Sequence, residues 1–177
     1  AIAFLVPTAT YTAYADEHAA TDSASLEAVA GQVPIVQPRD VFLSNHREYG
    51  LSIYDTHADG SATYYSSRRR PILAMSPTHK YYYAPLPSMN WSLSADLHIV
   101  DWLEAEGYDY DVITDDDLHN EGPGIIEPYN VVVTGNHPEY VTGEMFDAME
   151  RYMRDGGRLM YLVGHGFCWV TASPPTG

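Results

Sequence analysis

Four short apolar runs limit what this chain can fold into. They occupy residues 2–6, 110–114, 130–134 and 158–163, and each is bounded by turn-forming or charged residues. Runs of this length and composition predict buried β-strands rather than helices. The chain therefore needs other elements that cover these strands.

The segments before two of the strands have helical periodicity. Residues 92–107 place apolar side chains on one face, with Ser94 as the expected N-cap and Gly107 at the end. Residues 142–157 repeat the pattern, with Thr142 and Gly156 at their ends. Strands that alternate with helices predict an α/β fold, in which helices cover both faces of an open, mostly parallel sheet.

A long irregular segment interrupts this alternation. Residues 31–90 are rich in Pro, Tyr, Ser and Arg, and we expect an excursion with little regular structure from a single α/β domain over residues 1–177. Long excursions in compact domains are often functional. The chain starts within an apparent strand and stops soon after another apolar run, so we expect a fragment of a longer chain.

Charge excludes some classes of partner. The chain has 24 acidic and 9 basic residues, for a formal charge of −15, which opposes binding to nucleic acid or to an anionic membrane surface. No apolar run approaches the roughly 20 residues that span a bilayer. The single cysteine, Cys168, cannot form an internal disulfide, which favours a reducing, cytoplasmic location.

Polar residues follow the predicted strands. In open α/β sheets, ligands bind outside the carboxyl ends of the strands, so these residues should share one edge. The excursion contributes a further group in "SIYDTHADG". The candidates are Tyr11, Tyr14, His137, Glu139 and His165 after strands, and Tyr54, Asp55, His57 and Asp59 in the excursion.

These residue types favour a metal site. Phenolate and carboxylate oxygens are hard donors that suit Fe(III), and imidazole suits several transition ions. Ordinary structural roles compete: the tyrosines as packed rings, the histidines as bridges between loops, and Glu139 as a solvated charge. Nucleophilic catalysis has little support, because Cys168 reads as an inert thiol in apolar surroundings and no nucleophile elbow is present.

The three consecutive arginines have a structural interpretation. In so acidic a chain, we expect Arg68, Arg69 and Arg70 to pair with carboxylates such as Asp55 and Asp59, or those near Glu139. Binding of a substrate anion is the alternative.

Six segments in order resemble one known family. "PTATYTAYADE", "SIYDTHADG", "YYSSRRRPIL", "SADLHIVDWLEAEGYDYDVITDDDLHNEG", "YNVVVTGNHPEY" and "GGRLMYLVGHGFCWV" are similar to the catalytic domain of N,N-dimethylformamidase large subunits. The resemblance implies a Rossmann-like fold related to class I glutamine amidotransferases. It also implies hydrolysis of small N-substituted formamides to formate and an amine, and a small helical partner subunit.

The resemblance further implies a mononuclear Fe(III) held by two tyrosines and a glutamate. Carried over to this chain, the ligands are Tyr14, Tyr54 and Glu139, with Tyr11 as a rival to Tyr14. His137 matches a histidine that lines the iron pocket. His165 stands where the family has an asparagine, and His137 and His165 are the candidate catalytic residues.

Two other hypotheses remain open at this level. The chain is alternatively a non-catalytic amidotransferase-like module whose aromatic segment "KYYYAPLPSMNW" binds a carbohydrate or a partner subunit. A zinc site is also possible, with His57, His137, His165 and Glu139 as candidate ligands.

Overall fold

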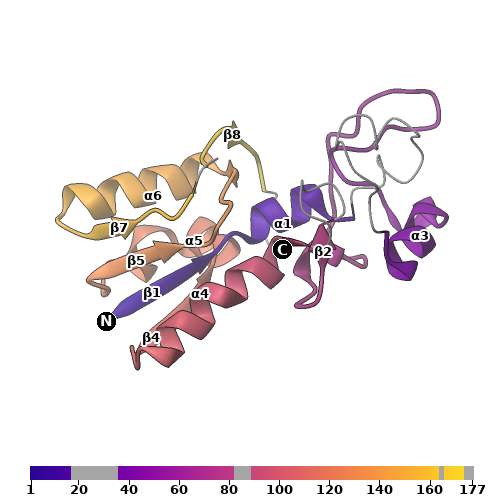
Figure 1. Ribbon diagram of the computed structural model, residues 1–177. Helices are drawn as coiled ribbons and strands as arrows, with labels where there is room; N and C mark the ends of the chain where they lie inside the picture. Colours follow the sequence, from indigo (N-terminus) through magenta and orange to yellow (C-terminus); the bar gives the residue numbers. More distant parts are fainter. Residues whose placement is uncertain (17–35, 82–88, 164–165, 174–177) are drawn as a thin grey trace. The chain divides into compact units, whose positions relative to one another are not determined.

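The structure is a computed structural model that describes residues 1–16, 36–81, 89–163 and 166–173 (Figure 1). The chain divides into two compact units. The sheet unit comprises residues 1–10 and 96–177, and the insert unit comprises residues 11–95. The single domain expected over residues 1–177 stays a prediction.

The sheet unit is built on four parallel strands. They are β1 (Ile2–Val6), β4 (Tyr110–Thr114), β5 (Val131–Thr134) and β7 (Arg158–Met160), in the order β4-β1-β5-β7. All four predicted strands are therefore present, and the parallel α/β sheet is confirmed. β1 and β5 are buried as predicted, whereas β4 and β7, the outer strands of this sheet, are largely exposed, so the prediction of burial was wrong for them. β7 is three residues shorter than expected, because its pairing with β5 ends at Met160. Beyond it, the Leu162 backbone N–H donates to the Thr134 hydroxyl oxygen at 3.2 Å.

Helices lie on both faces of this sheet. β4 leads through α5 (Asp115–Glu121) and the short η4 (Gly122–Ile125) into β5, and α6 (Gly143–Arg154) leads into β7. Since parallel connections are right-handed, these helices share one face and α4 (Leu93–Ala105), which precedes β4, runs along the other (Figure 1). Thr142 caps α6 as expected, by accepting a hydrogen bond from the Met145 backbone N–H.

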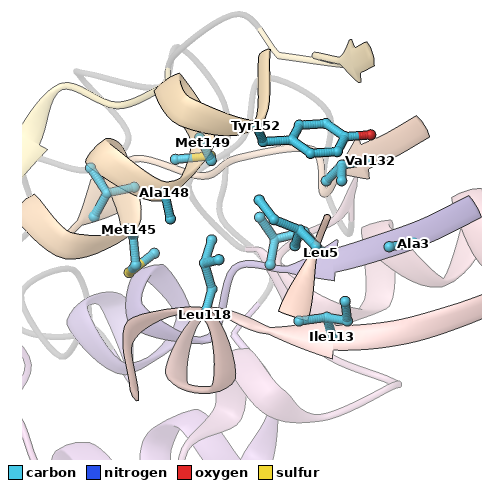
Figure 2. Packing of buried hydrophobic residues seen from close by; sticks show 11 residues of the cluster. Ala3, Leu5, Ile113, Leu118, Val132, Met145, Ala148, Met149 and Tyr152 are labelled. Carbon is cyan, nitrogen blue, oxygen red and sulfur yellow. The ribbon is translucent and has the colours of Figure 1, made fainter. Parts of the chain in front are cut away.

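The main core lies between the sheet and the face of α5 and α6 (Figure 2). Leu5 and Val132 from the strands meet Leu118 from α5 and Met145 and Met149 from α6, all of them buried. Apolar side chains at helical spacing bury one stripe of each helix against the strands, which is the dominant stabilising term for such a layer.

A second pair of strands extends the sheet unit. β6 (Tyr140–Val141) pairs in parallel with β8 (Trp169–Val170), with Tyr140 opposite Trp169. The pairing fastens the segment that follows β5 to the C-terminal part of the chain. Cys168 lies just before β8 and is exposed, so the expectation of apolar surroundings for this thiol was wrong.

The described part of the insert unit contains only short elements. α1 (Thr8–Tyr14) begins in the sheet unit and ends here, and it occupies a segment after β1 for which the sequence predicted no helix. The remaining elements are α3 (Pro38–Ser44), η2 (Arg47–Tyr49), η3 (Leu73–Met75), and the antiparallel strands β2 (Lys80–Tyr81) and β3 (Met89–Asn90).

Two sequence expectations are corrected in the insert unit. α4 starts at Leu93, so Ser94 lies inside the first turn; its hydroxyl accepts from the Trp91 backbone N–H at 3.0 Å and donates to the His79 carbonyl at 2.6 Å. Arg70 pairs with Asp16 at 2.9 Å, not with the carboxylates near Asp55, Asp59 or Glu139. Both side chains of this ion pair are almost fully buried.

His79 makes the stability of the insert unit depend on pH. Burial, with a smaller contribution from the Arg39 charge, lowers the pKa of His79 to about 4 from its ordinary 6.5. Between pH 6.5 and pH 4, His79 is protonated in the unfolded chain but neutral in the folded chain. The contribution of neutral His79 to the free energy of unfolding is therefore fully present above pH 6.5 and is lost as the pH falls toward 4. The full loss is about 3 kcal/mol, at ~1.4 kcal/mol per pKa unit.

Urea unfolding at pH 7.5 and pH 4.5 tests this expectation. His79→Gln should reduce the difference in unfolding free energy between the two pH values by about 2 kcal/mol. The same change at the exposed His98 serves as the control. Equal pH dependence in the two variants would contradict the role of His79.

Among the helices of the described ranges, none combines the length and the hydropathy of a membrane span.

Candidate functional site

The segment after β5 carries two of the predicted site residues, and its backbone is fixed at several points. Gly135 donates to the Leu5 carbonyl at 3.1 Å, and the Asn136 N–H donates to the Asp96 carboxylate at 2.5 Å. A Cβ on Gly135 would lie 2.6 Å from the Asp96 side chain, so only glycine allows this approach. The segment therefore leaves the sheet in one defined direction.

Thr10 in α1 holds the next part of this segment. Its hydroxyl oxygen accepts from the backbone N–H groups of Glu139 at 3.0 Å and Tyr140 at 3.1 Å. Thr10 and Glu139 are both buried, with Glu139 only 4% exposed. Each buried donor thus has a partner, as a buried backbone requires. Glu139 is not the solvated charge that its sequence position also allowed.

The Glu139 carboxylate lies between two ring nitrogens. His137 Nε2 is 3.0 Å from Oε2, and the Trp169 indole Nε1 donates to Oε1 at 3.1 Å. The structure thus brings His137 and Glu139 together as predicted. A buried carboxylate with donors on both oxygens is held in one orientation, which a ligand or an acid–base group requires.

Sequence reasoning did not find Trp169 as a partner of Glu139. The two residues are 30 positions apart and are joined through the pairing of β6 with β8. Neither strand is longer than two residues, so neither has a periodicity that could be detected. The only sequence signal was an aromatic residue just after the glycine-rich turn that contains His165.

Tyr14 and Tyr54 form a second group, within the insert unit. Their rings stack with centroids 4.6 Å apart, and the Trp91 ring meets Tyr14 edge-on at 5.6 Å. Tyr14 is the last residue of α1, and Tyr54 is 40% exposed. Two residues that are 40 positions apart in the sequence therefore place their phenol rings side by side.

Tyr11, the rival of Tyr14, has a different environment. It is 1% exposed and lies one helical turn before Tyr14 in α1. The stacked neighbour of Tyr54 is Tyr14, which supports the choice of Tyr14 over Tyr11 for a shared role. The assignment of either as a ligand stays a prediction.

The other candidates are less informative. His57 is exposed in a turn, where its backbone N–H donates to the Ser61 carbonyl at 2.9 Å. His165 and most of the aromatic segment 80–91 lie outside the described residues. Within the described ranges, no three His, Cys, Asp or Glu side chains gather to hold a metal ion, so the zinc alternative gains no support there.

Two further buried acids support the carboxyl edge of the sheet. Asp115 follows β4 directly and accepts from the Ala9 N–H at 3.2 Å, while Asp96 holds Asn136. Burial raises the pKa of Asp115 well above its usual value, and the charges of Asp116 and Asp96 raise it further. Both acids accept from backbone N–H groups, which indicates a role in fixing the chain near Glu139.

The residues present fit a ferric ion by their chemistry. Tyr14 and Tyr54 offer phenol oxygens from adjacent rings, and Glu139 offers a buried, oriented carboxylate. These hard oxygen donors suit Fe(III) better than soft or late transition metals.

Comparison with known proteins agrees with the sequence resemblance. The family model described as "N,N-dimethylformamidase beta subunit-like, C-terminal" matches residues 1–177. The "N,N-dimethylformamidase beta subunit" of Paracoccus aminophilus is 44% identical over 175 residues, and that of Alcaligenes sp is 42% identical over the same length. These matches cover 98% of this chain but 22% of each relative, so the chain spans about a fifth of their length.

Proposed function

This chain belongs to the N,N-dimethylformamidase beta subunit-like, C-terminal family, and from that premise we propose that it is the catalytic part of an iron-dependent amide hydrolase. The substrate is N,N-dimethylformamide or a related small N-substituted amide, which is cleaved at the C–N bond to formate and an amine. The observation that carries the proposal is the buried Glu139 carboxylate, fixed between His137 and Trp169 after β5.

The proposed ligands of a mononuclear Fe(III) are Tyr14, Tyr54 and Glu139. When bound, the ion supplies Lewis acidity toward the formyl oxygen and makes a water molecule easier to deprotonate. Support comes from the donor chemistry, from the adjacent phenol rings of Tyr14 and Tyr54, and from the fixed carboxylate of Glu139.

His137 is the proposed acid–base residue. Its Nε2 lies 3.0 Å from Glu139 Oε2, so the ring is oriented by a carboxylate, and its side chain is 17% exposed. A histidine in this position can take a proton from the attacking water and return it to the departing amine. Water adds to the formyl carbon, the C–N bond breaks, and the amine leaves with the proton. His165 is a second proposed catalytic residue.

The relatives suggest a partner. They are named as beta subunits, which implies an assembly with another kind of subunit, and we propose a small helical partner for this chain. A cytoplasmic location and a fold related to class I glutamine amidotransferases complete the proposal.

The first experiment measures iron content and the visible spectrum of the protein purified in its natural assembly from iron-replete cells. We expect one iron per chain and a tyrosinate-to-iron absorption band. Tyr14→Phe and Tyr54→Phe should each lose or shift the band, whereas Tyr65→Phe, at a residue that is 90% exposed, should leave it unchanged. Tyr11→Phe distinguishes Tyr11 from Tyr14 as the ligand from α1, because only the substitution at the true ligand should change the band.

A folded wild-type protein without iron would overturn this proposal. The alternative, a non-catalytic module that binds a carbohydrate or partner subunit, would then be tested by binding measurements on the same preparation.

A further inference from the structure

Trp169 has an unusual combination of exposure and bonding. The residue is 58% exposed, yet its indole N–H donates to the buried Glu139 carboxylate at 3.1 Å. An exposed ring contributes little burial of apolar surface, so packing alone does not explain its position. The hydrogen bond is its most specific contact.

The backbone around Trp169 holds the same acidic residue. The N–H groups of Cys168 and Trp169 donate to the Glu139 carbonyl at 3.1 and 3.2 Å, and the Phe167 N–H donates to the Pro138 carbonyl at 2.8 Å. Both the main chain and the side chain of Glu139 are therefore fixed by one short segment. Three backbone bonds therefore hold the main chain of Trp169 beside that of Glu139.

The two donors to Glu139 differ in their chemistry. An imidazole nitrogen changes between donor and acceptor with its tautomer and protonation, whereas the indole nitrogen is always a donor. Oε1 thus has a constant partner in Trp169, while Oε2 faces His137, which can exchange protons. One carboxylate oxygen is held and the other lies beside an acid–base group.

We propose that Trp169 is a positioning residue that orients the Glu139 carboxylate for metal binding. The inference rests on the proposed function, because it takes Glu139 to be a ligand. Partners that hydrogen-bond to a ligand fix its orientation, and their loss typically lowers metal affinity by roughly 10–100-fold. The indole N–H is expected to act in this way, without touching the substrate.

The test compares Trp169→Phe with Trp102→Phe in the natural assembly. Trp102 lies in α4 of the sheet unit and is 44% exposed, so the same change there is a matched control. We expect Trp169→Phe to lower iron affinity, measured by competition with a chelator, by roughly 10–100-fold and to shift the tyrosinate-to-iron band. The melting temperature should change little in either variant.

A second variant removes the N–H and keeps the ring shape. Replacement of Trp169 by 3-benzothienylalanine puts sulfur in place of the indole nitrogen, so any loss of iron affinity reports the hydrogen bond itself. Unchanged affinity and an unchanged band in this variant would overturn the inference, while an iron-loaded wild type would preserve the proposed function. Equal losses in the Trp169 and Trp102 variants would also overturn it. An iron-free wild type would overturn both.

Discussion

Under the proposed function, Glu139→Gln is expected to remove the proposed iron and to lower kcat/KM for a small formamide by about 1,000-fold, or ~4 kcal/mol of transition-state stabilisation. The change keeps the shape of the side chain but removes its charge. An amide offers one oxygen acceptor, and its NH₂ group would face either His137 Nε2 or the Trp169 N–H. With the amide oxygen toward the Trp169 N–H, His137 Nε2 would have to become an acceptor for the NH₂ group. The site would therefore lose a hard anionic donor and change the tautomer of His137.

Iron content, kcat/KM and melting temperature should be measured on the same preparation. Glu106→Gln is the control, since Glu106 is exposed after the end of α4. The proposed function predicts normal iron content and activity in the control. A Glu139→Gln protein that keeps its iron and its tyrosinate band would show that Glu139 is not a ligand.

Leu118→Ala is expected to lower the free energy of unfolding by about 3–4 kcal/mol, the middle of the usual range for a buried leucine. Leu118 is 0% exposed and lies in the core between α5, α6 and the sheet (Figure 2). The truncation loses apolar burial and leaves a cavity, because strands on one side and α6 on the other prevent collapse.

Leu97→Ala provides the matched comparison. Leu97 is also in a helix but is 37% exposed, so we expect a cost below about 1 kcal/mol. Urea unfolding of both variants measures the difference. Similar costs at the two positions would mean that the core in Figure 2 does not dominate the stability of the sheet unit.

The strands of the sheet could be predicted from the sequence because each one lies in a short, mostly apolar run of strand length, although β4 contains Asp111 and β7 begins with Arg158. α6 could also be predicted, since Thr142 and the apolar stripe that includes Met145 and Met149 mark its start and its buried face. α1 was missed because its sequence, TATYTAY, combines β-branched residues with no acidic first turn and reads as a loop. Its helical form depends on tertiary contacts such as those of Thr10 and Ala9.

In the candidate site too, contacts between distant residues could not be predicted from the sequence. His137 and Glu139 could be placed together because they are two residues apart after one strand. Neither the contact of Trp169 with Glu139 nor the stacking of Tyr14 on Tyr54 follows from any local pattern, since each joins distant parts of the chain. Arg70 likewise finds Asp16, 54 positions away, although nearer carboxylates are available in the sequence.

The pairing of β6 with β8 also sets an order of events during synthesis. Glu139 is made 30 residues before Trp169, so a nascent chain carries the acid well before it carries the indole that holds it. Contacts between distant residues form late because their loop must close first. The acid is therefore expected to reach its final orientation only once the segment that contains Trp169 has left the ribosome.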